Sequence, residues 1–198
     1  MKISKSVSAT FSLAFLFAAQ ASQAVVLDFN SLSAGGTSLV NVADGYTEDG
    51  FRFLNLQIPN AFDSFGVWQT GSGAYAGSPA LFNQYQDAMT QLTQIGGGAF
   101  DATSIQLASL NLSPLPNTVT FTGTRANNST VTQAITLSNP TVLLTYNLTG
   151  MTNIVKLEWA QSVPFHQFDN INVNPVPEPA TIAVLGIGAL ALIRRRRK

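Results

Sequence analysis

Apolar and polar residues alternate in short runs between positions 25 and 174, which is the pattern of half-buried β-strands. In residues 50–56, Phe51, Phe53 and Asn55 share one predicted face. No long stretch has the 3.6-residue period of an amphipathic helix. Further strands are predicted at 25–29, 103–112, 152–160 and 167–173.

The clearest local unit is a β-hairpin over residues 118–137. Apolar residues such as Val119 and Phe121 alternate with threonines on both sides of an Arg-Ala-Asn-Asn-Ser turn at 125–129. Many short strands separated by Gly, Asn and Pro predict an all-β fold, a β-sandwich of the jelly-roll kind.

The first 24 residues are arranged as a secretory signal peptide. Two lysines precede an apolar run at 11–19, and Ser22 and Ala24 place small residues at the −3 and −1 positions. We therefore expect cleavage by signal peptidase before Val25 and export of the remainder.

The C-terminal end has the reverse arrangement. Its prolines, Pro177 and Pro179, flank Glu178, an uncharged apolar run follows at 180–193, and the chain ends in a basic cluster of Arg194, Arg195, Arg196, Arg197 and Lys198. As a helix the run spans roughly 21 Å, less than the ~30 Å hydrocarbon core, and snorkelling arginines make up part of the difference. We predict a single hydrophobic helix with its basic end in the cytoplasm and transient anchoring in the inner membrane.

These three elements in this order resemble the PEP-CTERM sorting signal, which occurs on exported proteins of Gram-negative bacteria that make extracellular polysaccharide. The resemblance implies recognition by an exosortase and cleavage near Pro-Glu-Pro. The predicted organisation is thus a signal peptide at 1–24, a β-sandwich domain at 25–174 and a sorting signal at 175–198.

The middle of the chain also resembles the galactose-binding-like or lectin-like jelly-roll domains often found ahead of this signal. The phrases that carry this second resemblance are 27–29, 46–51, 77–83, 98–101 and 168–171. It implies no particular activity.

Composition and charge narrow the function. The chain has no Cys, which excludes disulfides, thiolate chemistry and Cys-ligated metals. Its net charge of zero conceals a strong asymmetry: residues 25–174 hold nine carboxylates and three cations, a charge of −6, and the positive charges lie at the two ends. An acidic domain without a basic patch argues against nucleic acid as a partner.

Enzymatic chemistry finds little support, and we predict no catalytic residue. His166 is the only histidine, which excludes a multi-histidine metal centre, and it is expected on the surface at the start of the last strand. A serine hydrolase elbow is absent from the sequence. A polysaccharide hydrolase or lyase that uses an Asp/Glu pair stays open as an alternative.

The carboxylates suggest calcium as a cofactor. Asp28 and Asp169 lie on the predicted first and last strands, which are commonly neighbours in jelly rolls, and Glu48 or Asp49 could join them from a loop. Solvated surface carboxylates are the alternative. This hypothesis leads to a calcium-dependent carbohydrate-binding module as a second candidate function.

An aromatic cluster suggests glycan binding. Trp68, Tyr75 and Tyr85 occur with three phenylalanines, Phe62, Phe65 and Phe82, within 24 residues. Exposed rings would stack on sugars, whereas the favoured alternative places these rings in the core. We expect Trp159 in the core as well. The leading prediction is a non-catalytic protein of the cell surface or extracellular matrix, associated with exopolysaccharide or the envelope.

Overall fold

The computed structural model describes residues 23–57, 63–110, 116–137 and 141–177. These residues belong to one compact unit, Ser22–Pro179. The predicted signal peptide, apart from its last two residues, and nearly all of the predicted sorting signal lie outside the described residues.

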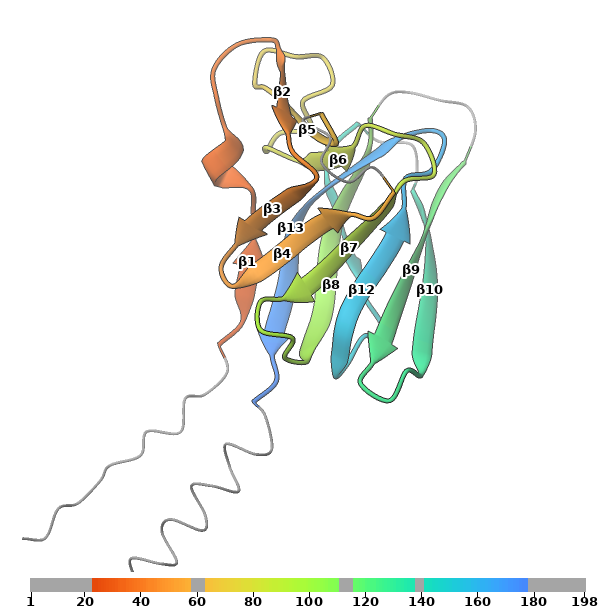
Figure 1. The fold of residues 1–198 in the computed structure, drawn as a ribbon. Coiled ribbons are helices and arrows are strands. Elements are labelled where there is room, and N and C mark those ends of the chain that lie inside the picture. Colours follow the sequence, from red (N-terminus) through yellow and green to blue (C-terminus); the bar gives the residue numbers. More distant parts are fainter. Residues whose placement is uncertain (1–22, 58–62, 111–115, 138–140, 178–198) are drawn as a thin grey trace, which may run out of the picture. The chain divides into compact units, whose positions relative to one another are not determined.

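The described residues form an antiparallel all-β fold (Figure 1). A short 3-10 helix, η1 (Asn30–Leu32), follows the first strand. The strands are β1 (Val25–Leu27), β2 (Leu39–Val42), β3 (Gly45–Glu48), β4 (Phe51–Asn55), β5 (Phe65–Trp68), β6 (Leu81–Asn83), β7 (Met89–Gln94), β8 (Phe100–Ser109), β9 (Asn117–Arg125), β10 (Thr130–Leu137), β11 (Leu144–Asn147), β12 (Ile154–Ala160) and β13 (His166–Pro175).

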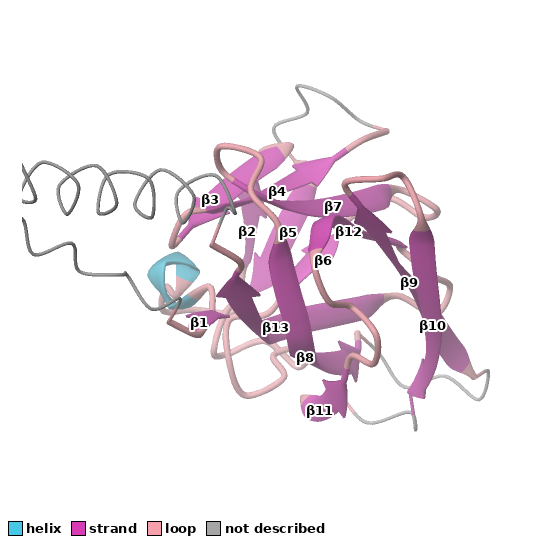
Figure 2. Cartoon of the chain, turned by 90° about the horizontal axis from the view of Figure 1, so that it is seen from below, coloured by secondary structure: helices cyan, strands magenta, loops and turns pink. Residues whose placement is uncertain are grey.

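Two facing layers make up the sandwich (Figure 2). The first layer has the strand order β3-β4-β7-β12-β9-β10. The second has the order β2-β5-β6-β13-β8-β11, with β1 paired to the same edge of β13 as β6. A single pairing of Ile154 with Phe100 connects the layers through β12 and β8. This arrangement confirms the predicted all-β sandwich.

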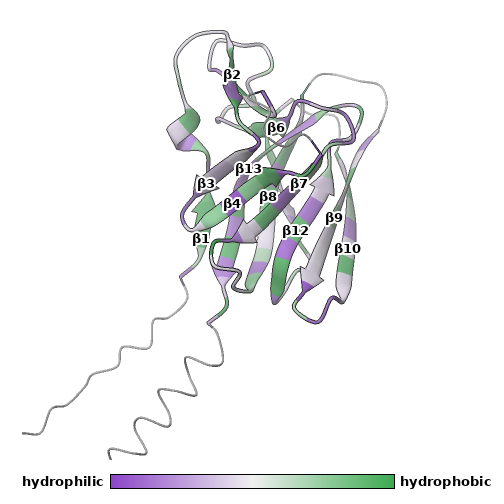
Figure 3. Ribbon diagram, in the orientation of Figure 1, coloured by the Kyte–Doolittle hydropathy of each residue, from purple (hydrophilic) through white to green (hydrophobic). Residues whose placement is uncertain are grey.

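The core lies between the layers and is rich in aromatic rings. Trp159 of the first layer meets Phe168 of the second edge-to-face, with ring centroids 4.9 Å apart, and Phe51 meets Phe100 in the same way at 5.2 Å. Hydrophobic and hydrophilic positions follow one another along β4, β7 and β12, as one buried face requires (Figure 3). The predicted burial of Trp159 is confirmed.

The strand predictions with clear alternation are confirmed. Phe51, Phe53 and Asn55 are all buried on one face of β4. The hairpin forms with Thr118 opposite Thr136, and its turn is closed by hydrogen bonds between residues 125 and 128–129. The first and last strands are neighbours, because Val25 pairs with Val173.

Candidate functional site

Three of the four predicted calcium ligands lie close to one another where β1, β3 and β13 meet. Asp28 directly follows β1. Because Leu27 pairs with Ile171 in antiparallel register, Asp28 lies level with Asn170 of β13. Glu48 ends β3, and its Oε2 accepts the backbone N–H of Phe29 at 3.2 Å. Phe29 itself has a left-handed backbone conformation, with a φ of 51°.

Asp169, on β13, is fully buried, and its environment disfavours the charged form. Burial, together with the neighbouring charges of Asp28 and Glu48, raises its pKa to about 7. Hydrogen bonds from Ser78 and from the Asn170 backbone N–H oppose this rise.

The pKa of Glu48 is also raised by its environment. Burial raises its pKa, the hydrogen bond from Phe29 lowers it, and Asp28 and Asp49 raise it. Asp49 therefore belongs to the same electrostatic neighbourhood, although it lies in the β3–β4 turn. The cluster is a region of mutual repulsion that either protons or a cation would relieve.

The carboxylates use much of their bonding capacity locally. Asp28 accepts both the backbone N–H of Asn30 (3.0 Å) and its side-chain amide (2.7 Å), and Asp169 accepts the amide of Asn170 at 3.1 Å. Within the described ranges, no group of three or more His, Cys, Asp or Glu side chains is arranged to hold a metal ion. The calcium site stays a prediction, and any ion there would need ligands from backbone and amide oxygens as well.

Trp68 ends β5 on the outer face of the second layer. Its alternation with Phe65 and Val67, both in the core, turns it away from the first layer. The indole lies parallel to the ring of Phe82, with centroids 6.4 Å apart and an interplanar angle of 5°. Trp68 is only partly buried.

Tyr75 lies in the long loop between β5 and β6 and is also partly buried. Gln167 Nε2 donates to the carbonyl of Ala74 at 3.0 Å and holds this loop over the outer face of β13. Phe168 pairs with Leu81, so the antiparallel register places Gln167 level with Phe82. The Tyr75 loop, which Gln167 binds, and the Trp68–Phe82 pair therefore occupy the same end of the second layer.

Tyr85 lies at the other end of the β5–β6 pair. Phe65 is opposite Asn83, and extending this antiparallel register places Tyr85 level with Asp63. The Tyr85 hydroxyl donates to Asp63 Oδ1 at 3.1 Å. Five residues of strand, about 17 Å, therefore separate Tyr85 from Trp68 along the ladder.

The remaining aromatic residues of the predicted cluster divide between core and undescribed chain. Phe65 is fully buried, Phe82 is 4% exposed, and Phe62 lies outside the described residues. The preference for core positions therefore holds for Phe65, whereas Phe82 is buried against Trp68 on the outer side of the second layer and the three other rings are half-buried.

The prediction for His166 is wrong, because the side chain is fully buried rather than on the surface. Its Nδ1 lies 3.0 Å from Ser162 Oγ, and burial lowers its pKa to about 3. The hydroxyl of Ser162 in turn donates to Asn117 Oδ1 at 2.6 Å.

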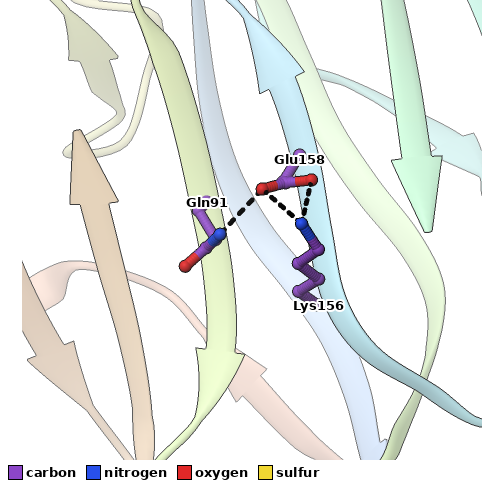
Figure 4. A network of polar contacts seen from close by, with 3 residues as sticks. All are labelled: Gln91, Lys156 and Glu158. Carbon is purple, nitrogen blue, oxygen red and sulfur yellow. Dashed lines mark hydrogen bonds and ion pairs between the residues drawn. The ribbon is translucent and has the colours of Figure 1, made fainter. Parts of the chain in front are cut away.

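A polar network on the outer face of the first layer was not predicted (Figure 4). Glu158 Oε1 accepts hydrogen bonds from Gln91 Nε2 (2.7 Å) and Lys156 Nζ (3.1 Å), and Lys156 also approaches Oε2 at 2.9 Å. Alternation around Leu157 could have placed Lys156 and Glu158 on one face. The contribution of Gln91 depends on strand order, which the local pattern does not contain.

The predicted sorting signal begins where the last strand ends. Pro175 pairs with Phe100, the N–H of Val176 donates to the carbonyl of Ala99, and Pro177 is exposed. Glu178, Pro179 and the arginines of the basic cluster lie outside the described residues. Within the part of the chain that the structure describes, no helix has the length and apolar character needed to span a bilayer.

The comparison with protein families gives one match. The family model of the PEP-CTERM protein-sorting motif matches residues 175–198, so the chain carries this motif. No curated protein matches the sequence.

Solved structures with a related strand arrangement are distant. A variant of the carbohydrate-binding module CBM29-2 is 9% identical, with 72% of this chain and 99% of that chain covered and a TM-score of 0.40. A family 29 carbohydrate-binding module is 11% identical, with 81% and 97% covered and a TM-score of 0.36. Allantoicase is 12% identical, with 57% and 36% covered and a TM-score of 0.35. At these scores the likenesses carry no argument about what this chain binds.

Proposed function

We propose that this chain is an exported surface or extracellular-matrix protein that an exosortase sorts, and that its β-sandwich acts by binding exopolysaccharide. The observation that carries the first part is the PEP-CTERM motif at 175–198, directly after β13. Only Val176 separates the end of this strand from the Pro-Glu-Pro sequence. Cleavage there leaves a complete sandwich with almost no C-terminal extension.

Localisation tests the sorting step. The protein would be expressed with and without Pro177–Lys198, and mass spectrometry would read both termini of the product. We expect a mature chain that begins near Val25, ends near Pro177 and lies outside the inner membrane. A mature chain that keeps Arg194–Lys198 would contradict sorting by this motif.

Binding by the sandwich rests on partly exposed aromatic rings. Trp68 and Tyr75 lie at one end of the second layer, and the stacked Phe82 holds the indole in a fixed orientation. A rigid, half-exposed ring offers a flat apolar surface to a sugar at low entropic cost. Tyr85 lies too far along the ladder to contact the same sugar ring.

Glycan-array binding by the exported protein separates these residues. We expect Trp68→Ala and Tyr75→Ala to weaken binding of the same glycans by roughly tenfold, the equivalent of about 1.4 kcal/mol. Val142→Ala is the matched control, because Val142 is an exposed apolar residue on another part of the domain. Equal losses in all three variants would rule out a site at Trp68 and Tyr75.

Calcium dependence is the second candidate, and the repelling carboxylates at Asp28, Glu48 and Asp169 support it. Binding at pH 7 would expel protons from Asp169, so the calorimetric heat should depend on the ionisation enthalpy of the buffer. Asp169→Asn should abolish the heat, and Asp87→Asn, a change at an exposed carboxylate, should preserve it. The absence of both heat and a shift in melting temperature would dispose of the site.

Hydrolysis or elimination of a polysaccharide is the third candidate. A buried acid with a pKa of about 7 beside a second carboxylate is typical of an acid–base pair, and Asp169 and Glu48 are such neighbours. Turnover of a polysaccharide that disappears in Glu48→Gln and persists in Asp87→Asn would replace the binding proposal with this one.

A further inference from the structure

Two rows of side chains cross the outer face of the first layer. Paired residues on neighbouring strands form the first row, which comprises Leu54, Gln91, Glu158, Thr122 and Thr132. The second row lies two residues further along each strand, on the same face. From β3 to β10 it comprises Thr47, Arg52, Thr93, Lys156, Thr124 and Thr130. We call these two rows the outer face.

The rows face away from the core on every strand. The alternate residues Phe53, Leu92 and Leu157 are fully buried between the layers. On the outer face, four side chains are exposed, Thr124 is buried and the rest are half-buried; the exposed ones are Thr47, Arg52, Thr130 and Thr132. All but Leu54 are polar, so this surface is built for hydrogen bonding rather than for packing.

Charge is distributed unevenly between this face and the rest of the domain. The outer face holds Arg52, Lys156 and the single carboxylate Glu158, a charge of +1. The whole domain from residue 25 to residue 174 carries −6, so the remainder carries −7. An anionic polymer is repelled by most of the domain and meets the least repulsion here.

The two cations occupy fixed positions in the second row. Arg52 and Lys156 lie on β4 and β12, which are separated by β7 alone, so their Cα atoms are about two strand spacings, or ~10 Å, apart. Glu158 holds Lys156 by both carboxylate oxygens. The guanidinium of Arg52 reaches over Gly45 of β3, whose missing side chain leaves it room.

We propose that the outer face binds an acidic polysaccharide that lies across the strands. Carboxylates of the polymer pair with Arg52 and Lys156, and its hydroxyls bond to Gln91 and the threonines. Guanidinium and carboxylate make strong, paired hydrogen bonds, which suits Arg52 to a uronate. The proposal rests on the proposed function for the protein's exposure to extracellular polysaccharide, but it concerns another layer than the one that bears Trp68.

Titration of the purified exported protein with polygalacturonate tests this proposal, with dextran as the neutral probe. We expect Arg52→Gln and Lys156→Gln each to weaken polygalacturonate binding about tenfold, the usual result of losing one charge-assisted hydrogen bond. Binding should also weaken as salt rises toward 0.1 M, where the screening length falls to about 10 Å. Arg125→Gln is the matched control, because Arg125 ends β9 and donates to Gly150 instead.

Three outcomes would overturn the inference: equal losses in Arg125→Gln, no loss in either outer-face variant, or dextran binding with the same dependence on Arg52. Melting temperatures of Arg52→Gln and Lys156→Gln show whether each variant is folded. One folded variant is enough to test binding by the outer face. Val142→Ala, at an exposed apolar residue outside the two rows, should leave polygalacturonate binding unchanged. Failure of the sorting experiment would remove the proposed function and leave this binding result standing.

Discussion

At the residue scale, His166 shows how the fold determines the state of one titratable group. Ser162 has a single hydroxyl hydrogen and gives it to Asn117 Oδ1, so its oxygen accepts from His166 Nδ1–H. This hydrogen bond assigns a ring proton to Nδ1, and the lowered pKa keeps the imidazole neutral near pH 7. A charge on this ring would have no water to solvate it, which is why burial lowers its pKa to about 3.

This pKa predicts a loss of stability in acid. The unfolded chain has an ordinary histidine pKa of about 6.5 and binds one more proton than the folded chain between pH 6.5 and 3. The free energy of unfolding therefore falls as pH drops through this window, by at most about 1.4 kcal/mol per pH unit from this residue. The deficit of His166→Gln, measured by urea denaturation, should shrink or reverse between pH 7 and pH 4.5.

Ser162→Ala is the control for this experiment, because it removes the hydrogen bond and keeps the imidazole. Its deficit should change little between the two pH values. If His166→Gln shows the same deficit at both pH values, burial does not depress the pKa of His166.

The sequence could predict Trp159 better than His166 for a physical reason. Trp159 sits between positions that alternate with it, so period alone assigns it to the buried face. His166 and the next three residues of β13, Gln167, Phe168 and Asp169, are all buried. A strand covered on both faces has no alternation, and its polar residues look like surface residues.

At the scale of elements, β9 depends on a glycine that the alternation pattern does not explain. Gly123 continues the buried face of Phe121, and a Cβ there would lie 2.8 Å from Met151 Sδ and 2.9 Å from Ile154 Cγ2. Without a side chain at this position, the loop before β12 can pack directly against the strand. The tight contact makes Gly123 part of the packing rather than a flexible point.

Gly123→Ala should therefore destabilise the domain by about 1–3 kcal/mol, the usual cost of overpacking. Gly73→Ala, in the β5–β6 loop, meets nothing within 4 Å and should stay within about 0.5 kcal/mol of the parent. Guanidinium denaturation of both variants gives the comparison. Similar midpoints for the two would show that Met151 and Ile154 move aside without cost.

Elements whose two faces differ carry the clearest signal in the sequence, although the doubly covered β13 was also predicted, at 167–173. β4 and the β9–β10 hairpin have one buried and one polar face, and both were found at the expected places. The short strands β5 and β6 were not predicted. Their residues are buried on both sides of the sheet. Phe65 and Leu81 lie in the core, and Gly66 and Phe82 are buried on the opposite side, where Phe82 stacks on Trp68.

At the scale of the whole molecule, the order of strands decides which residues meet, and this order is not local information. Asp28 and Asp169 were expected to be neighbours from the general habit of jelly rolls, and the β1–β13 pairing supports that expectation. The residues of the outer face could not be predicted as neighbours in the same way. Gln91 and Glu158 become neighbours only because β7 and β12, far apart along the chain, pair with each other.

The same strand order makes the last strand indispensable. β13 pairs with β8 at eight positions along one edge and with β6 and β1 along the other. Its Phe168 contacts the rings of Phe29, Phe53 and Trp159. Loss of one such buried phenylalanine side chain costs roughly 3–5 kcal/mol, and a domain of this size has a total stability of only about 5–15 kcal/mol.

We therefore expect a chain of residues 25–176 to fold and a chain of residues 25–165 to remain unfolded. Near-ultraviolet circular dichroism and resistance to a non-specific protease would distinguish them. A cooperative melting transition in the shorter chain would show that β13 is dispensable. If β13 is required, the sandwich is complete only when the chain reaches residue 175, which Val176 alone separates from the Pro-Glu-Pro sequence of the motif at 175–198.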